Sequence, residues 1–402
     1  MTYTKPSTDD TGDTGDVGDY DLFGDDYVRD PASTWSQIRN RECPVGHSTA
    51  YDGSYMPVTY DDVCNAARNH ESFTSTQSVS VLGLEGPPGS TAITTDPPDH
   101  QWVRRMLLPT MAPGAVRAYE EGTAELCRSL IAGFKSEGRA DAAADYAQQI
   151  PVRVISALLG VPDEQADEFV GWVRDILEFA NVGDLREVAL GKLVKFLFSQ
   201  LAQRKESPGS DIISDFVHME HDGAPIDDMI IVAQSALLLV AGIDTTWSAI
   251  GSSLYHLATH PDDRKVLAED PDAWDYAIEE FLRFYSPVTM GRAATQDTEI
   301  AGCPIPKGGR LLLNFPGANR DPEMFVDPDT FIIDRAQNRH VAFGAGIHRC
   351  AGSNLARMEL RIALQEWMAA IPEFELEDAD AVTWAGGQVR GPRSVPVVFS
   401  AQ

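Results

Sequence analysis

The sequence is poor in positive charge. Lys and Arg number 32 against 61 Asp and Glu, which gives a formal net charge of −29. Because phosphate-rich partners are bound by clustered Lys and Arg, this balance argues against a nucleic-acid binder or a protein that binds anionic membranes. An acidic surface of this kind favours solubility instead.

Cysteine and long apolar runs are also scarce. The five cysteines, at positions 43, 64, 127, 303 and 350, form no CxxC pair and no even framework. No signal peptide is recognisable, and no apolar run approaches the roughly 18 residues that cross a bilayer. These absences predict a soluble protein without a membrane span, in a reducing cytoplasm. Cys43 and His47 lack further ligands nearby, so we expect no metal site there.

Charge and composition set the domain boundaries. Residues 1–30 hold nine Asp and no Glu against one Lys and one Arg, a net of −7, and the segment is predicted to be disordered. No Pro/Gly/Ser-rich linker divides the rest, so residues 31–402 are expected to form one domain. Helical periodicity dominates there, with helices between 115 and 200 and short strands between 296 and 314.

One cysteine stands in a glycine-rich loop, Phe343-Gly-Ala-Gly-Ile-His348-Arg-Cys350-Ala-Gly352. Residues 353–370 repeat apolar side chains at helical spacing, so Cys350 precedes a helix N-terminus. The partial positive charge there favours thiolate over thiol, and glycines let the backbone approach a flat ligand closely. A lone cysteine is more often a small buried hydrophobe, so the loop alone leaves both interpretations open.

The loop pattern Phe-Gly-x-Gly-x-His-x-Cys-x-Gly resembles the haem-binding loop of the cytochrome P450 family. The resemblance implies that Cys350 is the axial ligand of a haem b iron, that His348 faces a haem propionate and that Phe343 packs beside the sulfur. Gly352 and Ala241 would contact the same cofactor. The implied fold is mainly α with a minor β region, a triangular helical fold around one buried haem.

Residues 229–260 form the most apolar helix of the chain, about 45 Å long, and Asp244 and Thr245 lie in its middle. An unpaired carboxylate there costs several kcal/mol. Either Asp244 pairs with a distant arginine, or it serves proton delivery, with Gly242 and the Thr hydroxyl locally widening the helix. The resemblance implies the second role, with Thr245 holding a water beside bound dioxygen.

Two further patterns match the family. His100 and Arg104 share one face of a helix that begins near Asp96, and the resemblance implies that they bind a propionate together with Arg292. Glu280 and Arg283 resemble the structural Glu-x-x-Arg motif, and Arg335 matches its third member. A buried triad of this kind specifies the fold locally and takes no part in the chemistry.

The substrate pocket depends on an irregular segment. Residues 74–93 lose periodicity and predict a long loop, which the resemblance places over the pocket. The candidate substrate contacts are Val81, Leu82, Leu84, Ile176, Phe179, Leu237, Ala241, Val288, Thr289, Met290, Gln388 and Val389. These mostly apolar side chains favour a mainly apolar small molecule.

The resemblance implies a monooxygenase that uses O2 and takes electrons from a ferredoxin-type donor with an NAD(P)H-dependent reductase. We expect the donor to dock on a basic patch formed by Arg105, Arg349, Arg357 and Arg361. A peroxide-driven enzyme, a non-enzymatic haem-thiolate ligand-binding protein and a carrier-bound substrate remain alternatives.

Overall fold

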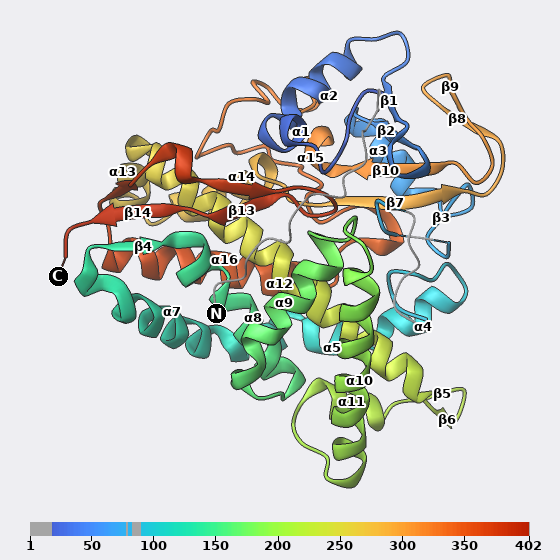
Figure 1. Cartoon of the computed structure of the whole chain (residues 1–402), viewed down its shortest axis with the longest axis horizontal. Helices are drawn as coiled ribbons and strands as arrows, with labels where there is room; N and C mark the ends of the chain where they lie inside the picture. Colours follow the sequence, from blue (N-terminus) through green and yellow to red (C-terminus); the bar gives the residue numbers. More distant parts are fainter. Residues whose placement is uncertain (1–17, 78, 83–89, 402) are drawn as a thin grey trace.

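The computed structural model describes residues 18–77, 79–82 and 90–401. Figure 1 shows a triangular outline, in which the long helices fill the lower part and strands lie mainly at the upper right and along the left side. Helices account for 54% of the chain, so the predicted mainly α fold with a minor β region is confirmed.

The longer helices form the body of the molecule. They are α7 (Glu120–Phe134), α8 (Gln149–Leu159), α9 (Ala166–Leu177), α10 (Leu185–Glu206), α12 (Asp228–Thr259), α14 (Ala273–Phe284) and α16 (Ser353–Ala370). Shorter ones connect them: α1 (Asp25–Arg29), α2 (Pro31–Arg39), α3 (Tyr60–Arg68), α4 (Asp99–Arg105), α5 (Leu108–Met111), α6 (Pro113–Val116), α11 (Ile212–Val217), α13 (Pro261–Glu269) and α15 (Phe315–Ala318).

Helix α12 runs through the centre of the molecule and packs against α8, α10 and α16 (Figure 1). Asp227 caps its N-terminus by accepting a hydrogen bond from the Met229 N–H. By length and composition α12 could cross a membrane, but 61% of its apolar window is buried inside the protein, as in a core helix. The backbone is α-helical from end to end, so the predicted local widening near Gly242 is absent.

In the described residues short strands form two sheets and three hairpins. The largest sheet has the order β1 (Val45–Ser48), β2 (Ser54–Pro57), β10 (Arg310–Asn314), β7 (Thr289–Ala294) and β3 (Phe73–Thr74). A second sheet joins β11 (Phe374–Leu376), β14 (Pro396–Phe399) and β4 (Arg139–Asp141). Three hairpins pair β5 (Glu220–His221) with β6 (Ala224–Pro225), β8 (Thr298–Ile300) with β9 (Cys303–Ile305), and β12 (Thr383–Ala385) with β13 (Gly391–Ser394).

The folded body begins earlier than predicted. Residues 1–17 lie outside the described residues, but residues 18–30, expected to be disordered, include helix α1 and form ordered structure. Tyr20, Leu22 and Tyr27 are buried in a cluster with Trp35 of α2 and Met56 of β2. These apolar side chains among the aspartates supply enough buried surface to order the segment.

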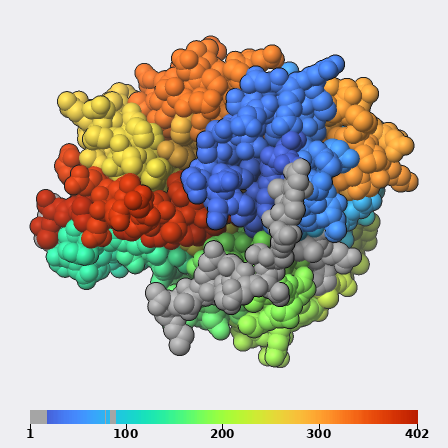
Figure 2. Space-filling view, turned by 45° about the horizontal axis from the view of Figure 1, so that its top comes forward, coloured from blue at the N-terminus to red at the C-terminus, as the bar shows by residue number. Residues whose placement is uncertain are grey.

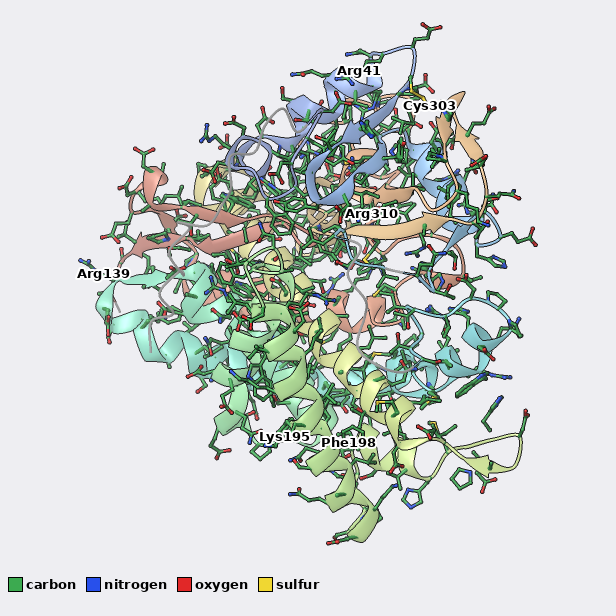
Figure 3. All side chains as sticks on the ribbon, turned by 45° about the vertical axis from the view of Figure 1, so that its right-hand side comes forward. Arg41, Arg139, Lys195, Phe198, Cys303 and Arg310 are labelled. Atoms are coloured by element: carbon green, nitrogen blue, oxygen red, sulfur yellow. A yellow bond between two sulfur atoms is a disulfide. The ribbon has the colours of Figure 1, made fainter. Side chains whose placement is uncertain are left out.

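Cys43 and Cys303 form a disulfide, which corrects the prediction of unpaired cysteines. The two residues are 260 positions apart, so their spacing could not indicate the pairing. Figure 3 shows Cys303 beside the loop that carries Arg41, at the edge of the molecule farthest from Lys195 and Phe198 of α10. Among the described residues Cys64, Cys127 and Cys350 are free thiols.

Candidate active site

The loop around Cys350 is held in shape by its own backbone. The Cys350 N–H donates to the Phe343 carbonyl at 2.8 Å, and the Gly344 N–H donates to the Val341 carbonyl at 2.8 Å. Gly346 has a φ of +71°, and a Cβ there would lie 2.6 Å from the carbonyl oxygen of Ala67. Only glycine fits this close approach, and α16 begins three residues beyond Cys350.

Cys350 faces a cavity of about 250 Å³, called here the Cys350 cavity. Its walls are the cysteine loop with Phe343 and Gly352, the α12 residues Leu237, Ala241 and Thr245, and the segment from Val288 to Arg292. A smaller hollow of about 120 Å³ adjoins it and shares the α12 wall. The Cys350 thiol lies deep inside the fold, and the space to which it is exposed is this internal cavity.

Three basic side chains, Arg104, Arg292 and His348, line one edge of this cavity, and His100 packs against His348. The rings of His100 and His348 lie 4.6 Å apart, and buried His100 Nε2 has no hydrogen-bond partner in the described part of the chain. Arg292 is buried, donates only to its neighbour's carbonyl and forms no ion pair with a described carboxylate. Arg104 donates to the Arg349 carbonyl. The predicted cluster of His100, Arg104, Arg292 and His348 is therefore assembled.

Burial sets the ionisation of this cluster. It lowers the pKa of Arg292 to about 10, and together with Arg292 and His100 it lowers the pKa of His348 to about 3. His348 is therefore neutral, with its ring nitrogens bonded to the Ser75 hydroxyl and the Ala92 carbonyl. The site offers an unpaired guanidinium and an unpaired imidazole nitrogen, which is what an incoming carboxylate requires.

The ionisation of Cys350 differs from the sequence expectation. Burial raises the pKa of its thiol, and the Gly352 N–H and Arg104 offset only part of that effect. The helix N-terminus alone therefore does not produce a thiolate. A coordinated metal cation deprotonates a thiol outright, so these surroundings suit a metal-bound sulfur.

Asp244 is buried and ion-paired. Its carboxylate lies 2.9 Å from Arg393 of β13, which also bonds Glu178 at 2.9 Å, and the Ser248 hydroxyl lies 3.4 Å away. Burial raises the pKa of Asp244 against the attraction of Arg393. The interpretation of a buried Asp paired with a distant Arg therefore describes this contact. Asp244 does not line the cavity, whereas its neighbour Thr245 does.

Thr245 has an ordered hydroxyl at the cavity. Its Oγ1 donates a hydrogen bond to the Ala241 carbonyl at 2.7 Å. Because the hydroxyl proton is used within the helix, the oxygen lone pairs remain available as acceptors. A water or a protonated group in the cavity can donate to them.

The predicted triad is present. Glu280 and Arg283 are fully buried and form a paired contact, with both N···O distances at 2.7 Å. Arg335 Nε lies 3.1 Å from the same carboxylate. The Ile332 N–H and the Asn338 amide donate to it as well, at 2.8 and 3.0 Å. This carboxylate is thus well satisfied, and its partners tie the segment 319–338 to α14.

Comparison with known proteins decides the family. A model of the cytochrome P450 family matches residues 178–273 and 274–381. The vitamin D(3) 25-hydroxylase of Pseudonocardia autotrophica is 34% identical over 390 residues, 94% of this chain and 96% of that protein.

The chain belongs to the cytochrome P450 family. The steroid C26-monooxygenase of Mycolicibacterium smegmatis is 33% identical over 87% of this chain and 88% of its own length. Among solved structures, the P450 CYP109E1 of Bacillus megaterium in complex with testosterone has a TM-score of 0.86 at 27% identity. The match covers 93% of this chain and 99% of that one.

This P450 is a monooxygenase, and haem b is the cofactor of the family. The residues present fit that group. Cys350 faces the cavity, and unpaired donors from His100 and Arg292 stand at its edge, where the carboxylates of a haem could accept from them. P450 enzymes also need O2, a substrate and a redox partner.

The predicted substrate contacts divide into two groups. Those that line the Cys350 cavity or the adjoining hollow are Ile176, Leu237, Ala241, Val288, Met290, Gln388 and Val389. Val81 and Leu82 are instead packed into the N-terminal apolar cluster, so these two predictions are wrong. Val79, a further candidate contact in the same loop, does line the hollow, together with Ser80. Leu84 lies outside the described residues.

Phe179 and Thr289 are also misplaced. Phe179 is buried beneath the Arg174 guanidinium, 5.2 Å from its ring centre, and lines neither hollow. Thr289 lies between Val288 and Met290, and because side chains alternate along a strand it faces the opposite side of the backbone. The period of a strand therefore excludes it from the pocket.

The predicted basic patch is half neutralised. Arg357 contacts Glu279 at 2.6 Å, and Arg361 contacts Asp275 at 2.6 Å. Arg105 and Arg349 are exposed and form no ion pair with a carboxylate elsewhere in the described structure. The patch therefore carries its positive charge on two residues only.

Arg393 and Glu359 were missed at the sequence level. Arg393 reaches Asp244 from 149 positions away, and no local pattern signals such a pair. Glu359 lies on the cavity side of α16, and burial raises the pKa of its carboxyl to about 8. A glutamate among the apolar positions of that helix was the available signal.

Proposed function

We propose that this P450 oxidises a mainly apolar molecule of the steroid or secosteroid class. The supporting observation is the Cys350 cavity with its adjoining hollow, whose walls beyond the basic edge are mostly Leu, Ile, Val, Met, Ala and Phe side chains. Such walls bury apolar carbon without hydrogen bonds. Two relatives carry names that refer to vitamin D(3) and to steroids, which favours this class.

Each site residue has a proposed role. Cys350 would hold the haem iron, and His100, Arg104, Arg292 and His348 would hold the propionates. When bound, the haem supplies the iron at which O2 is activated. Thr245 would position a water with its free lone pairs, and Asp244 would exchange protons with that water after leaving Arg393. The triad of Glu280, Arg283 and Arg335 would keep the segment below the cofactor in place.

Electrons would come from a ferredoxin-type donor with an NAD(P)H-dependent reductase, in the cytoplasm. Docking would depend on Arg105 and Arg349, the two unpaired cations of the predicted patch. Reversing both charges should slow electron transfer and flatten its dependence on salt. Unchanged transfer kinetics would refute this docking site.

The substrate class is tested by titrating the purified holoenzyme with steroids, secosteroids, terpenes, fatty acids, aromatics and macrolides. We expect steroids and secosteroids to shift the haem Soret band and to be oxidised when NAD(P)H and a surrogate ferredoxin system are supplied. Oxidation of another class alone would contradict the proposal. Turnover with peroxide only, or binding without turnover, would favour the two alternative functions.

The ligand role of Cys350 has a spectroscopic test. Cys350→Ser should abolish the red-shifted absorption band of the reduced carbon monoxide complex, which depends on thiolate ligation. Cys64→Ser is the matched control, since Cys64 is a buried free thiol that does not line the cavity. A band retained in Cys350→Ser would overturn the assignment.

A further inference from the structure

A second cavity, of about 240 Å³, lies on the other side of the backbone from the Cys350 cavity. It is called here the Arg390 cavity. It forms where the N-terminal segment meets the C-terminal hairpin, and Figure 2 shows these segments, blue and red, in direct contact. The Gly387 N–H donates to the Leu22 carbonyl at 2.8 Å across this junction.

Arg390 lines this cavity with an unpaired charge. Its Nε donates to the Val28 carbonyl at 2.8 Å, and its guanidinium lies 4.5 Å from the centre of the Trp384 ring. It forms no ion pair with a carboxylate in the described ranges. Burial lowers its pKa, yet an arginine stays charged in proteins. A buried guanidinium without an anion is costly.

Other donors at this cavity also lack acceptors. Ser286 is 7% exposed, and its Oγ has no hydrogen-bond partner among the described residues. Arg320 Nε is likewise buried and without a partner there. Both residues line the cavity with Arg390. Unmet donors of this kind call for an acceptor, and an anion supplies several lone pairs at once.

The charge balance limits the anion to one negative charge. Arg320 is already neutralised by Asp329 at 3.0 Å, and Arg29 lies 3.7 Å from Asp26 on the surface. Asp30 lines the cavity as well, and its charge acts on Arg390 without a direct ion pair. The cavity therefore lacks the excess positive charge that a dianion needs, so a monocarboxylate on Arg390 fits better than a phosphate dianion.

The remaining walls are aromatic. Rings of Tyr27, Trp35, Tyr255 and Trp384 line the cavity, and Trp384 already stacks beneath the Arg390 guanidinium. Flat faces of this kind favour a flat ligand by ring contacts. We propose that the Arg390 cavity binds a small aromatic monocarboxylate, with the carboxylate on Arg390 and the ring among these side chains.

The holoenzyme tests this site. Phenylacetate and benzoate are titrated by calorimetry and by tryptophan fluorescence, since Trp35 and Trp384 line the cavity. The Soret band is recorded in parallel because it reports occupation of the Cys350 cavity. We expect saturable binding of the carboxylates with the Soret band unchanged, and at least tenfold weaker binding of the neutral phenylacetamide and of inorganic phosphate.

Variants assign the binding to this cavity. Arg390→Gln should weaken phenylacetate binding at least tenfold, with Arg390→Lys intermediate because a lysine cannot bind a carboxylate through two N–H groups. Ser286→Ala, which removes one hydroxyl without adding volume, should weaken it severalfold. Arg139→Gln, an exposed arginine of β4, should bind as the wild type does.

Three results would overturn the proposal. They are the absence of saturable phenylacetate binding to the wild type, wild-type affinity in both Arg390→Gln and Ser286→Ala, or a shift of the Soret band that tracks phenylacetate binding. Thermal unfolding of each variant shows that it is folded. A folded Ser286→Ala keeps the test decisive if Arg390→Gln does not fold.

Discussion

At the scale of single residues, Asp244 and Thr245 are neighbours in α12 with different surroundings. Thr245 faces the Cys350 cavity with acceptor lone pairs, whereas Asp244 faces Arg393. Thr245→Ala should therefore remove the water-binding hydroxyl while leaving the fold intact. We expect O2 consumption to continue, product per O2 to fall severalfold and hydrogen peroxide to rise, as measured by oxygen electrode and product analysis.

Thr259→Ala is the matched control for this prediction. Thr259 makes the same type of bond, from its hydroxyl to the Tyr255 carbonyl at 3.0 Å, at the exposed end of the same helix. It should turn over like the wild type. Fully coupled turnover in Thr245→Ala would show that the hydroxyl plays no part in proton delivery.

Glu359 makes the stability of the folded protein depend on pH. Burial raises the pKa of its carboxyl to about 8, and one carboxylate oxygen has no partner among the described residues. Between the ordinary carboxyl pKa and about pH 8 the folded state keeps a proton that the unfolded state has released. Stability should therefore fall as the pH rises through this window and level off above it.

Glu359→Gln should lose this dependence, because an amide stays neutral at every pH. We expect the variant to match the wild type near pH 5 and to melt several degrees higher at pH 8.5 in thermal unfolding. Glu125→Gln, on the exposed face of α7, should follow the wild type at both values. Parallel curves for Glu359→Gln and the wild type would contradict the buried-acid interpretation.

The sequence predicted residues whose partners lie close along the chain. His100 with Arg104, and Cys350 with Phe343 and His348, stand within ten positions of each other and fit motifs whose spacing carries the geometry. Arg393 has its partners at positions 178 and 244, and its role follows only from the docking of β13 on α12. Side chains in the loop before α4 were misplaced because irregular backbone has no period from which to assign a face.

At the scale of elements, the Glu280 carboxylate connects α14 to the segment around Arg335. Removing its charge leaves two buried guanidinium groups without their anion, which costs about 3–5 kcal/mol. Glu280→Gln should therefore lower the unfolding free energy by this amount and reduce haem incorporation. Denaturant unfolding and the ratio of haem to protein absorbance measure both effects.

An exposed pair provides the control. Glu121 contacts Arg128 at 2.9 Å on the surface of α7, where water and salt screen the charges. Glu121→Gln should change neither unfolding nor haem content measurably. If Glu280→Gln behaved like Glu121→Gln, the triad would not hold this part of the fold.

Elements with strong periodicity were predicted well and their boundaries less so. Helix α12 was expected over residues 229–260 and spans Asp228–Thr259, because its apolar residues recur over many turns. Strand β1, by contrast, was not predicted, because its pairing with β2 decides its conformation. A short strand depends on its neighbour in the sheet, and the local sequence does not contain that information.

At the scale of the whole molecule, the disulfide between Cys43 and Cys303 joins the N-terminal part to the β8–β9 hairpin. A cross-link that closes so long a loop restricts the unfolded chain and contributes about 2–4 kcal/mol. A reductant should therefore lower the melting temperature of the wild type. The double variant Cys43→Ser with Cys303→Ser should melt at the lower temperature with or without reductant.

Thiol counting by mass spectrometry checks the pairing in the same samples. Wild-type protein purified without reductant and alkylated after unfolding should show three modified cysteines, as many as the double variant and two fewer than the reduced wild type. Equal melting of the wild type with and without reductant would contradict a stabilising cross-link. A protein from a reducing cytoplasm would carry the two thiols unpaired and have the lower melting temperature.

The Cys350 cavity and the Arg390 cavity share one partition of two short segments. The Thr289 N–H donates to the Gln388 carbonyl at 3.0 Å, and the Arg390 N–H donates to the Pro287 carbonyl at 2.8 Å. Val288 and Val389 face one cavity from this partition, while Thr289 and Arg390 face the other. Occupants of the two cavities are therefore thermodynamically linked wherever one moves the partition. If a ligand in one cavity changes the dissociation constant of a ligand in the other by some factor, the second ligand changes the dissociation constant of the first by the same factor.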